Sequence, residues 1–148
     1  MFNEFMQKAI DEGKKAYKEG EVPVGAVMVY KGKVIAAADD TVIKDNNPTY
    51  HAEILAINEA LKTLGTTYLT DCSLYVTKEP CIMCLGAVIN TRIKRVYFGA
   101  YDIKYGAGDY VLGLMHQKKL NHYTEIYGGI MENECKKLLE DFFRCGLS

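Results

Sequence analysis

The sequence contains two short stretches that decide its fold and its chemistry: His51-Ala52-Glu53, and further along Pro80-Cys81-Ile82-Met83-Cys84. An imidazole and two thiols are ligands that zinc prefers, and three protein ligands leave a fourth position open, as in catalytic sites. Glu53 need not be a ligand, because a carboxylate beside metal-bound water can transfer its proton to a leaving group. The sequence therefore predicts one Zn²⁺ per chain, with Glu53 as the catalytic proton shuttle.

Both stretches are expected at the starts of helices. Apolar residues recur with a helical period after His51, and Pro80 is typical of the first turn of a helix. A helix N-terminus stabilises a thiolate, and the i, i+3 spacing places Cys81 and Cys84 on one face. Two helix starts can therefore converge on one metal ion. A redox-active cysteine pair is the weaker alternative, because it gives His51 and Glu53 no role.

The composition is that of an ordinary globular protein. With 148 residues, 49% of them hydrophobic and 25% charged, the chain is expected to fold as one domain spanning residues 1–148. No apolar run approaches the length of a membrane span, and the N-terminus lacks the pattern of a signal peptide. Cys72, Cys135 and Cys145 remain outside the metal motif, and this odd number favours reduced thiols in the cytoplasm. A net charge of −1 gives no general attraction to nucleic acid.

Hydrophobic periodicity predicts helices and strands that alternate along most of the chain. The expected helices are 2–19, 51–65, 81–90 and 131–145, and the expected strands are 24–30, 33–38, 73–77, 95–100 and 125–127. This order predicts an α/β sandwich with a mixed sheet. The last helix is expected to turn Leu138, Leu139, Phe142 and Phe143 inward. Residues 101–110, rich in Gly and Tyr, are either a lid over the site or an ordinary surface loop.

The pattern H-x-E followed by P-C-x-x-C is the signature of zinc-dependent nucleoside and nucleobase deaminases. The chain resembles this cytidine-deaminase-like superfamily, and flanking segments make it most similar to the bacterial tRNA adenosine deaminases. These segments are 21–27, 48–49, 51–54, 74–77, 79–81, 83–84, 86–87, 92–93, 95–96, 98–100, Asp102, Lys104, 106–107, 120–122 and 141–144. The resemblance therefore covers almost the whole chain.

This resemblance implies a three-layer α/β/α sandwich with a mixed five-stranded sheet, and a homodimer. It implies hydrolytic deamination of adenosine to inosine at the wobble position of a tRNA anticodon, in a single zinc-dependent deaminase domain. His51, Cys81 and Cys84 would hold the zinc. The residues that it places in contact with the substrate are Val22, Asp40, Ala52, Asp102, Lys104, Asn121, His122 and Phe143.

Two positions depart from the family pattern. Asp40 stands where the family usually has Asn on the loop that contacts the base, and Tyr123 stands where Arg is common. An ionised carboxylate and adenine N7 can only accept hydrogen bonds, so Asp40 facing N7 would oppose two acceptors. These departures keep open a second hypothesis, a deaminase of a free nucleobase or nucleoside. A third is a zinc-stabilised RNA-binding module without turnover.

Overall fold

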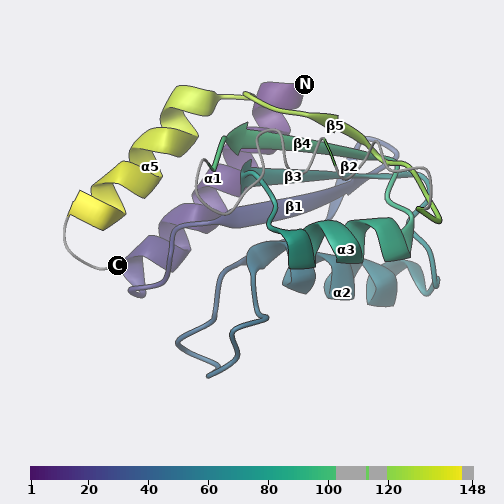
Figure 1. Ribbon diagram of the computed structural model, residues 1–148, viewed down its shortest axis with the longest axis horizontal. Coiled ribbons are helices and arrows are strands. Elements are labelled where there is room, and N and C mark those ends of the chain that lie inside the picture. Colours follow the sequence, from purple (N-terminus) through teal and green to yellow (C-terminus); the bar gives the residue numbers. More distant parts are fainter. Residues whose placement is uncertain (103–112, 114–119, 145–148) are drawn as a thin grey trace.

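The computed structural model describes residues 1–102, 113 and 120–144, and its centre is a five-stranded sheet with the strand order β2-β1-β3-β4-β5 (Figure 1). The strands are β1 (Gly25–Tyr30), β2 (Lys33–Asp39), β3 (Cys72–Lys78), β4 (Arg95–Ala100) and β5 (Glu125–Tyr127). The helices are α1 (Phe2–Lys18), α2 (Ala52–Leu64), α3 (Ile82–Thr91) and α5 (Glu132–Arg144). The α/β sandwich expected from the sequence is confirmed.

The sheet is mixed. β1 pairs antiparallel with β2 and with β3, whereas β3–β4 and β4–β5 are parallel. The β1–β2 hairpin turns at Lys31 and Gly32, whose φ angles of 50° and 76° suit the tight turns that connect twisted strands. The parallel strands β3 and β4 are linked through α3, as parallel pairing requires a crossover. The carboxyl ends of β3 and β4 therefore lie at the same edge of the sheet.

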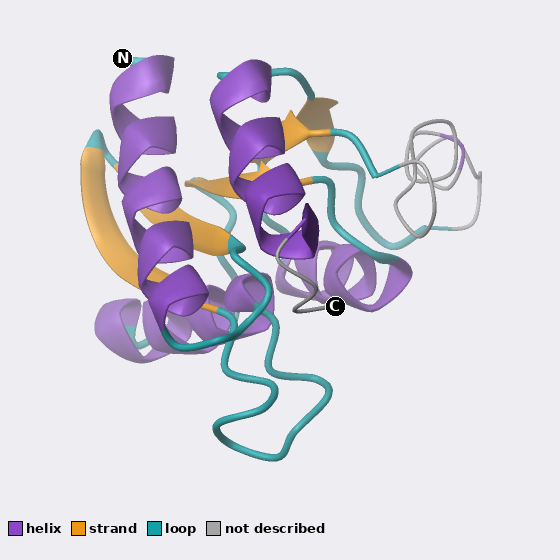
Figure 2. Ribbon diagram, turned by 90° about the vertical axis from the view of Figure 1, so that its left-hand side faces the viewer, coloured by secondary structure: helices purple, strands orange, loops and turns teal. Residues whose placement is uncertain are grey.

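Two helices cover each face of the sheet. Figure 2 shows α1 and α5 side by side on one face, and α2 and α3 lie on the other (Figure 1). α1 is amphipathic and buries Phe5, Met6, Ala9, Ile10, Gly13 and Ala16. It contacts β1 closely, because a Cβ added at Gly25 would lie 2.8 Å from the Cβ of Glu12. Buried residues from the helices and the central strands form the main core.

Each predicted helix and strand is present, with shifts of one or two residues at the ends. One expectation about the last helix is wrong. Phe142 is buried at 1% exposure, but Phe143 is 47% exposed, because consecutive helical residues point about 100° apart. The segment 101–110, expected to be either a lid or an ordinary surface loop, lies mostly outside the described residues. Among the described helices, none has both the length and the apolar character needed to cross a membrane.

Candidate metal centre and substrate cavity

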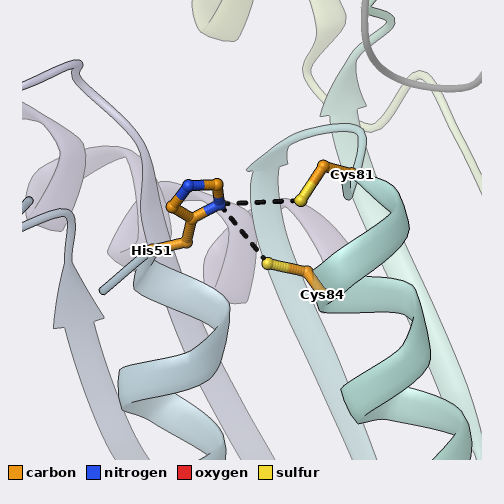
Figure 3. A group of neighbouring side chains, drawn as sticks. All are labelled: His51, Cys81 and Cys84. Atoms are coloured by element: carbon orange, nitrogen blue, oxygen red, sulfur yellow. Dashed lines mark hydrogen bonds between the residues drawn. The ribbon is translucent and has the colours of Figure 1, made fainter. Parts of the chain in front are cut away.

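His51, Cys81 and Cys84 meet between the starts of α2 and α3 (Figure 3). The Nδ1 atom of His51 lies 3.6 Å from the sulfur of Cys81 and 3.6 Å from the sulfur of Cys84. A tetrahedral zinc ion, with Zn–S bonds of about 2.3 Å and Zn–N bonds of about 2.05 Å, places its nitrogen and sulfur ligands about 3.6 Å apart. The three side chains therefore have the separation and the chemistry of zinc ligands.

The local backbone explains why these side chains converge. His51 and Cys81 are the N-cap residues of α2 and α3, with extended ψ angles of 153° and 175°. Their carbonyl groups accept the first helical hydrogen bonds, from the N–H of Leu55 at 3.1 Å and of Leu85 at 2.9 Å. Cys84 lies three residues into α3, so its sulfur returns to the side of Cys81. Each ligand is thus fixed by the start of a helix.

The two cysteines of the motif differ from the others in charge. The pKa of Cys81 is lowered to about 4, because Cys84 and then His51 hydrogen-bond its sulfur. The pKa of Cys84 is raised, since its own proton is held in the bond to Cys81. Burial instead raises the pKa of Cys72 to about 11 and that of Cys135 to about 12. A thiolate, the form that binds metals, is therefore available at the motif and not at these core cysteines.

Glu53 lies in the first turn of α2, one residue beyond Ala52, and its side chain lines the cavity beside His51 and Cys81. It is only 4% exposed. Burial raises the pKa of its carboxyl group above the ordinary value. A carboxyl group that binds a proton more readily than usual suits a group that must accept a proton and then release it.

The cavity beside this cluster has a volume of about 590 Å³, within the usual range of ligand pockets. It opens where β3 and β4 end and where α2 and α3 begin, as sites in α/β folds commonly do. Its lining residues are Glu21, Val22, Val24, Asp40, Val42, Ile43, Pro48, His51, Glu53, Lys78, Glu79, Cys81, Ile82, Asp102 and Phe142.

Asp40 stabilises the start of α2, next to the candidate metal ligand His51. Its Oδ1 atom accepts a hydrogen bond of 2.6 Å from the N–H of Ala52, the first residue of α2. The side chain of His51 does not cap α2, so Asp40 satisfies a donor at the helix start. Burial, and then the charge of Glu53, raise the pKa of Asp40 to about 8.

Two charged residues join the ends of the parallel strands at the cavity wall. Lys78, the last residue of β3, forms a 2.9 Å salt bridge with Asp102, which follows β4. The N–H of Asp102 donates to Oε1 of Glu79 at 3.0 Å, and the N–H of Glu79 donates to the carbonyl of Ala100 at 2.8 Å. These bonds fix the edge of the sheet from which Pro80 and Cys81 leave.

The structure brings most of the predicted site residues together. The residues that line the cavity include Val22, Asp40, Asp102, His51, Glu53 and Cys81, and Cys84 is buried within the ligand cluster. Ala52 is buried and contributes its N–H to Asp40. Lys104 falls outside the described residues.

Besides Ala52, three predicted contact residues do not line this cavity. The Nε2 of His122 lies 2.9 Å from the carbonyl of Ile93, while Asn121 and Phe143 are exposed. Sequence reasoning missed Glu21, Glu79 and Lys78, which line the cavity. A single charged residue in a turn or at a strand end carries no signal of burial. Glu21 and Glu79 lie in segments that match the family, and Lys78 directly follows the predicted strand 73–77, so these places in the sequence were the available signals.

Comparison with known proteins gives concordant results. Residues 2–145 match the family model of the MafB19-like deaminases. The tRNA-specific adenosine deaminase of Bacillus subtilis (strain 168) is 45% identical over 140 residues, covering 95% of this chain and 87% of that protein. A solved structure from a study of A-to-I editing by tRNA:A34 deaminases is 40% identical, with a TM-score of 0.88, and the match covers 92% of this chain and 99% of that one.

A guanine deaminase of Bacillus subtilis is also similar, over a shorter span. Its structure is 41% identical with a TM-score of 0.63, and the match covers 66% of this chain and 63% of that chain. The similarity to the adenosine deaminases, by contrast, runs through nearly the whole length of both proteins. The span of the family model, residues 2–145, includes the sheet, the residues that line the cavity and the metal motif. The chain belongs to the family of tRNA-specific adenosine deaminases.

Proposed function

We propose that this protein is a zinc-dependent aminohydrolase that converts adenosine to inosine at the wobble position of a tRNA anticodon. One observation carries the proposal: a His–Cys–Cys cluster with zinc-like separations lies beside the buried carboxyl group of Glu53, in a cavity of about 590 Å³. The relatives that match almost the whole chain are named for this substrate.

His51, Cys81 and Cys84 would hold the zinc ion, which when bound supplies the Lewis acidity that makes water nucleophilic near neutral pH. Glu53 takes a proton from the attacking water and delivers it to the amino nitrogen on C6 of adenine. A C6–O bond forms, the C6–N bond breaks, and ammonia leaves. The apolar walls, among them Val22, Val42 and Phe142, hold the base away from bulk water.

The cavity can take one base with its ribose, so the target nucleotide has to leave its stack to enter. Contacts of Asn121, His122 and Phe143 with the substrate would then be made to parts of the RNA outside the cavity. Lys104 is assigned to the same RNA-binding role. A homodimer and a cytoplasmic location complete the proposal, and sedimentation of the purified protein tests the first of these.

Deamination of a free nucleobase is the second candidate, and Asp40 is the observation that favours it. Its carboxyl group lines the cavity beside Glu53. Above its raised pKa of about 8 this group is ionised, and it would then accept an N–H of a base instead of donating to adenine N7. The similar protein from Bacillus subtilis, which matches about two thirds of this chain, is named a guanine deaminase, and guanine is such a free base. Replacing Asp40 by Asn should then shift the preference towards adenosine.

A panel of substrates tests the proposal directly. The zinc-loaded protein is incubated with an anticodon stem-loop carrying adenosine at the wobble position, and with a control that carries this adenosine one position away. Free adenosine, guanine and cytosine complete the panel, and ammonia and inosine are measured. We expect inosine in the first RNA alone. Ammonia from guanine, with none from either RNA, would overturn the tRNA assignment in favour of the free base.

A further inference from the structure

The rim loop, residues 41–50, forms one wall of the cavity and leads directly to the metal ligand His51. Figure 1 shows it extending away from the sheet between β2 and α2. Val42, Ile43 and Pro48 of this loop line the cavity, yet residues 43–46 are exposed to solvent. A wall built from such a loop needs an anchor to keep a defined position.

Glu21 provides this anchor. Its Oε1 atom accepts a hydrogen bond of 3.0 Å from the N–H of Ile43, and its Oε2 atom accepts one of 2.8 Å from the N–H of Lys44. The residue is only 2% exposed although it carries a carboxylate. Two adjacent N–H groups need two acceptor atoms, which a carboxylate offers and a side-chain amide does not.

The two N–H groups that Glu21 binds lie in the first turn of a helical segment, where backbone donors have no acceptor within the helix itself. The N–H of Asp45 donates to the carbonyl of Thr41 at 2.9 Å, so the loop contains one helical turn. Ile43 and Lys44 occupy the positions in that turn whose N–H groups a capping residue normally satisfies. Here the cap comes from a distant segment, 22 and 23 residues before the two N–H groups that it binds.

The anchor is itself held rigidly. The N–H of Glu21 donates to the carbonyl of Ala16 at 3.0 Å, which closes the end of α1, and Gly20 before it takes the left-handed φ of 79°. The end of α1 and the rim loop are thus connected through one buried side chain. The metal ligands are fixed separately, by the starts of α2 and α3.

We propose that Glu21 is a positioning residue for the substrate: it holds the rim loop in place as the cavity wall that receives the nucleoside. The inference rests on the proposed function for the identity of that nucleoside. Glu21 acts through Val42 and Ile43, which the loop presents to the cavity, and takes no part in the proton transfer.

Loosening this anchor has a distinct kinetic consequence. If the rim loop is displaced in the free enzyme, the substrate has to select the fraction in which the loop is in place, and KM rises by the inverse of that fraction. Once the substrate is bound, the wall is restored and kcat is unchanged. Damage to the fold would instead reduce the amount of active enzyme, which lowers the apparent kcat and leaves KM as it was.

The test uses Glu21→Gln, which keeps the shape of the side chain and removes one acceptor. Glu12→Gln is the matched control, because Glu12 forms an ion pair with Lys15 on α1 and is not among the residues that line the cavity. We expect KM for the anticodon stem-loop to rise about tenfold in Glu21→Gln, equivalent to about 1.4 kcal/mol, with kcat within twofold of wild type. Zinc content should stay at one per chain. The amides of Ile43 and Lys44 should exchange with deuterium faster, while those inside α2 keep their wild-type rates.

Unchanged KM or unchanged exchange at Ile43 and Lys44 would overturn the inference, and so would a fall in kcat at constant KM. If Glu21→Gln fails to fold, exchange in the wild-type protein decides: rates typical of an unstructured peptide at these two amides would refute the anchor, and protection would support it. A wild-type protein that forms no inosine would instead refute the proposed function, and the exchange result would still decide the role of Glu21.

Discussion

Replacing Asp40 by Asn should remove the contribution that this carboxyl group makes to the pH dependence of stability in the metal-free protein. The Asn side-chain oxygen can still accept the N–H of Ala52, which Asp40 accepts at 2.6 Å, so the start of α2 keeps its cap. What the substitution removes is a buried acid whose pKa is raised from 3.8 to about 8, chiefly by burial. The change therefore isolates the effect of charge from that of the hydrogen bond.

The sign follows from proton binding. A carboxyl group with a higher pKa in the folded state holds more protons when folded, so stability is greatest below the unfolded pKa and falls as the pH rises towards the folded value. Integrating from pH 5 to pH 8 with pKa values of 3.8 and about 8 gives a loss of about 3–4 kcal/mol attributable to Asp40. That is a large part of the total stability of a typical domain.

Urea unfolding of the chelator-treated protein at pH 5 and at pH 8 measures this loss. Asp45→Asn, the same change at an exposed residue of the rim loop, is the control and should retain the wild-type slope. Between pH 5 and pH 8, the change in stability of Asp40→Asn should differ from that of wild type by about 3–4 kcal/mol, in favour of the variant at pH 8. If it loses as much stability over this range as wild type does, Asp40 is not the buried acid responsible, and the reasoning fails.

Three further outcomes are expected. Glu53→Gln should lower inosine formation at least about 100-fold while metal analysis still finds one zinc per chain, and retained activity would exclude the proton-shuttle role. In the metal-free protein, iodoacetamide should alkylate Cys81, whose pKa is about 4, well before Cys135, whose pKa is about 12. Added zinc should protect Cys81 from alkylation. Equal labelling of the two cysteines in mass spectrometry would contradict this. Gly99→Ala should destabilise the protein by about 1–3 kcal/mol in urea unfolding, because its Cβ would lie 2.8 Å from that of Cys135, whereas Gly86→Ala, with open space around it, should not.

The parts of the fold that the sequence predicted are those in which local pattern and tertiary structure agree. The period of apolar residues indicated α1, and the nearly continuous apolar run at 26–29 indicated the buried strand β1. The metal cluster was predictable because zinc demands a particular set of ligands, and His51 and Cys81 both precede helical patterns.

Sequence reasoning failed where a position depends on packing between distant segments. Phe142 and Phe143 are adjacent and equally apolar, and only the contact of α5 with Tyr17 and the cavity distinguishes the buried ring from the exposed one. From the sequence, Glu21 is an ordinary residue of the turn that ends the first helix. The residues next to it in the sequence do not indicate the two N–H groups that it binds much further along the chain. Asp40 was expected to face the base, and its bond to Ala52 was not foreseen.

Because His51 and Cys81 are N-cap residues, a zinc ion held by them would report the local order of two helix starts. Fraying of the first turn of α2 or α3 moves a ligand, so the occupied site and the intact helix start depend on each other through one equilibrium. Substitutions far from the cavity that loosen either turn will consequently appear as a weaker affinity for zinc before they appear as global unfolding. Across a set of variants, zinc affinity would rank how firmly each keeps these two turns closed.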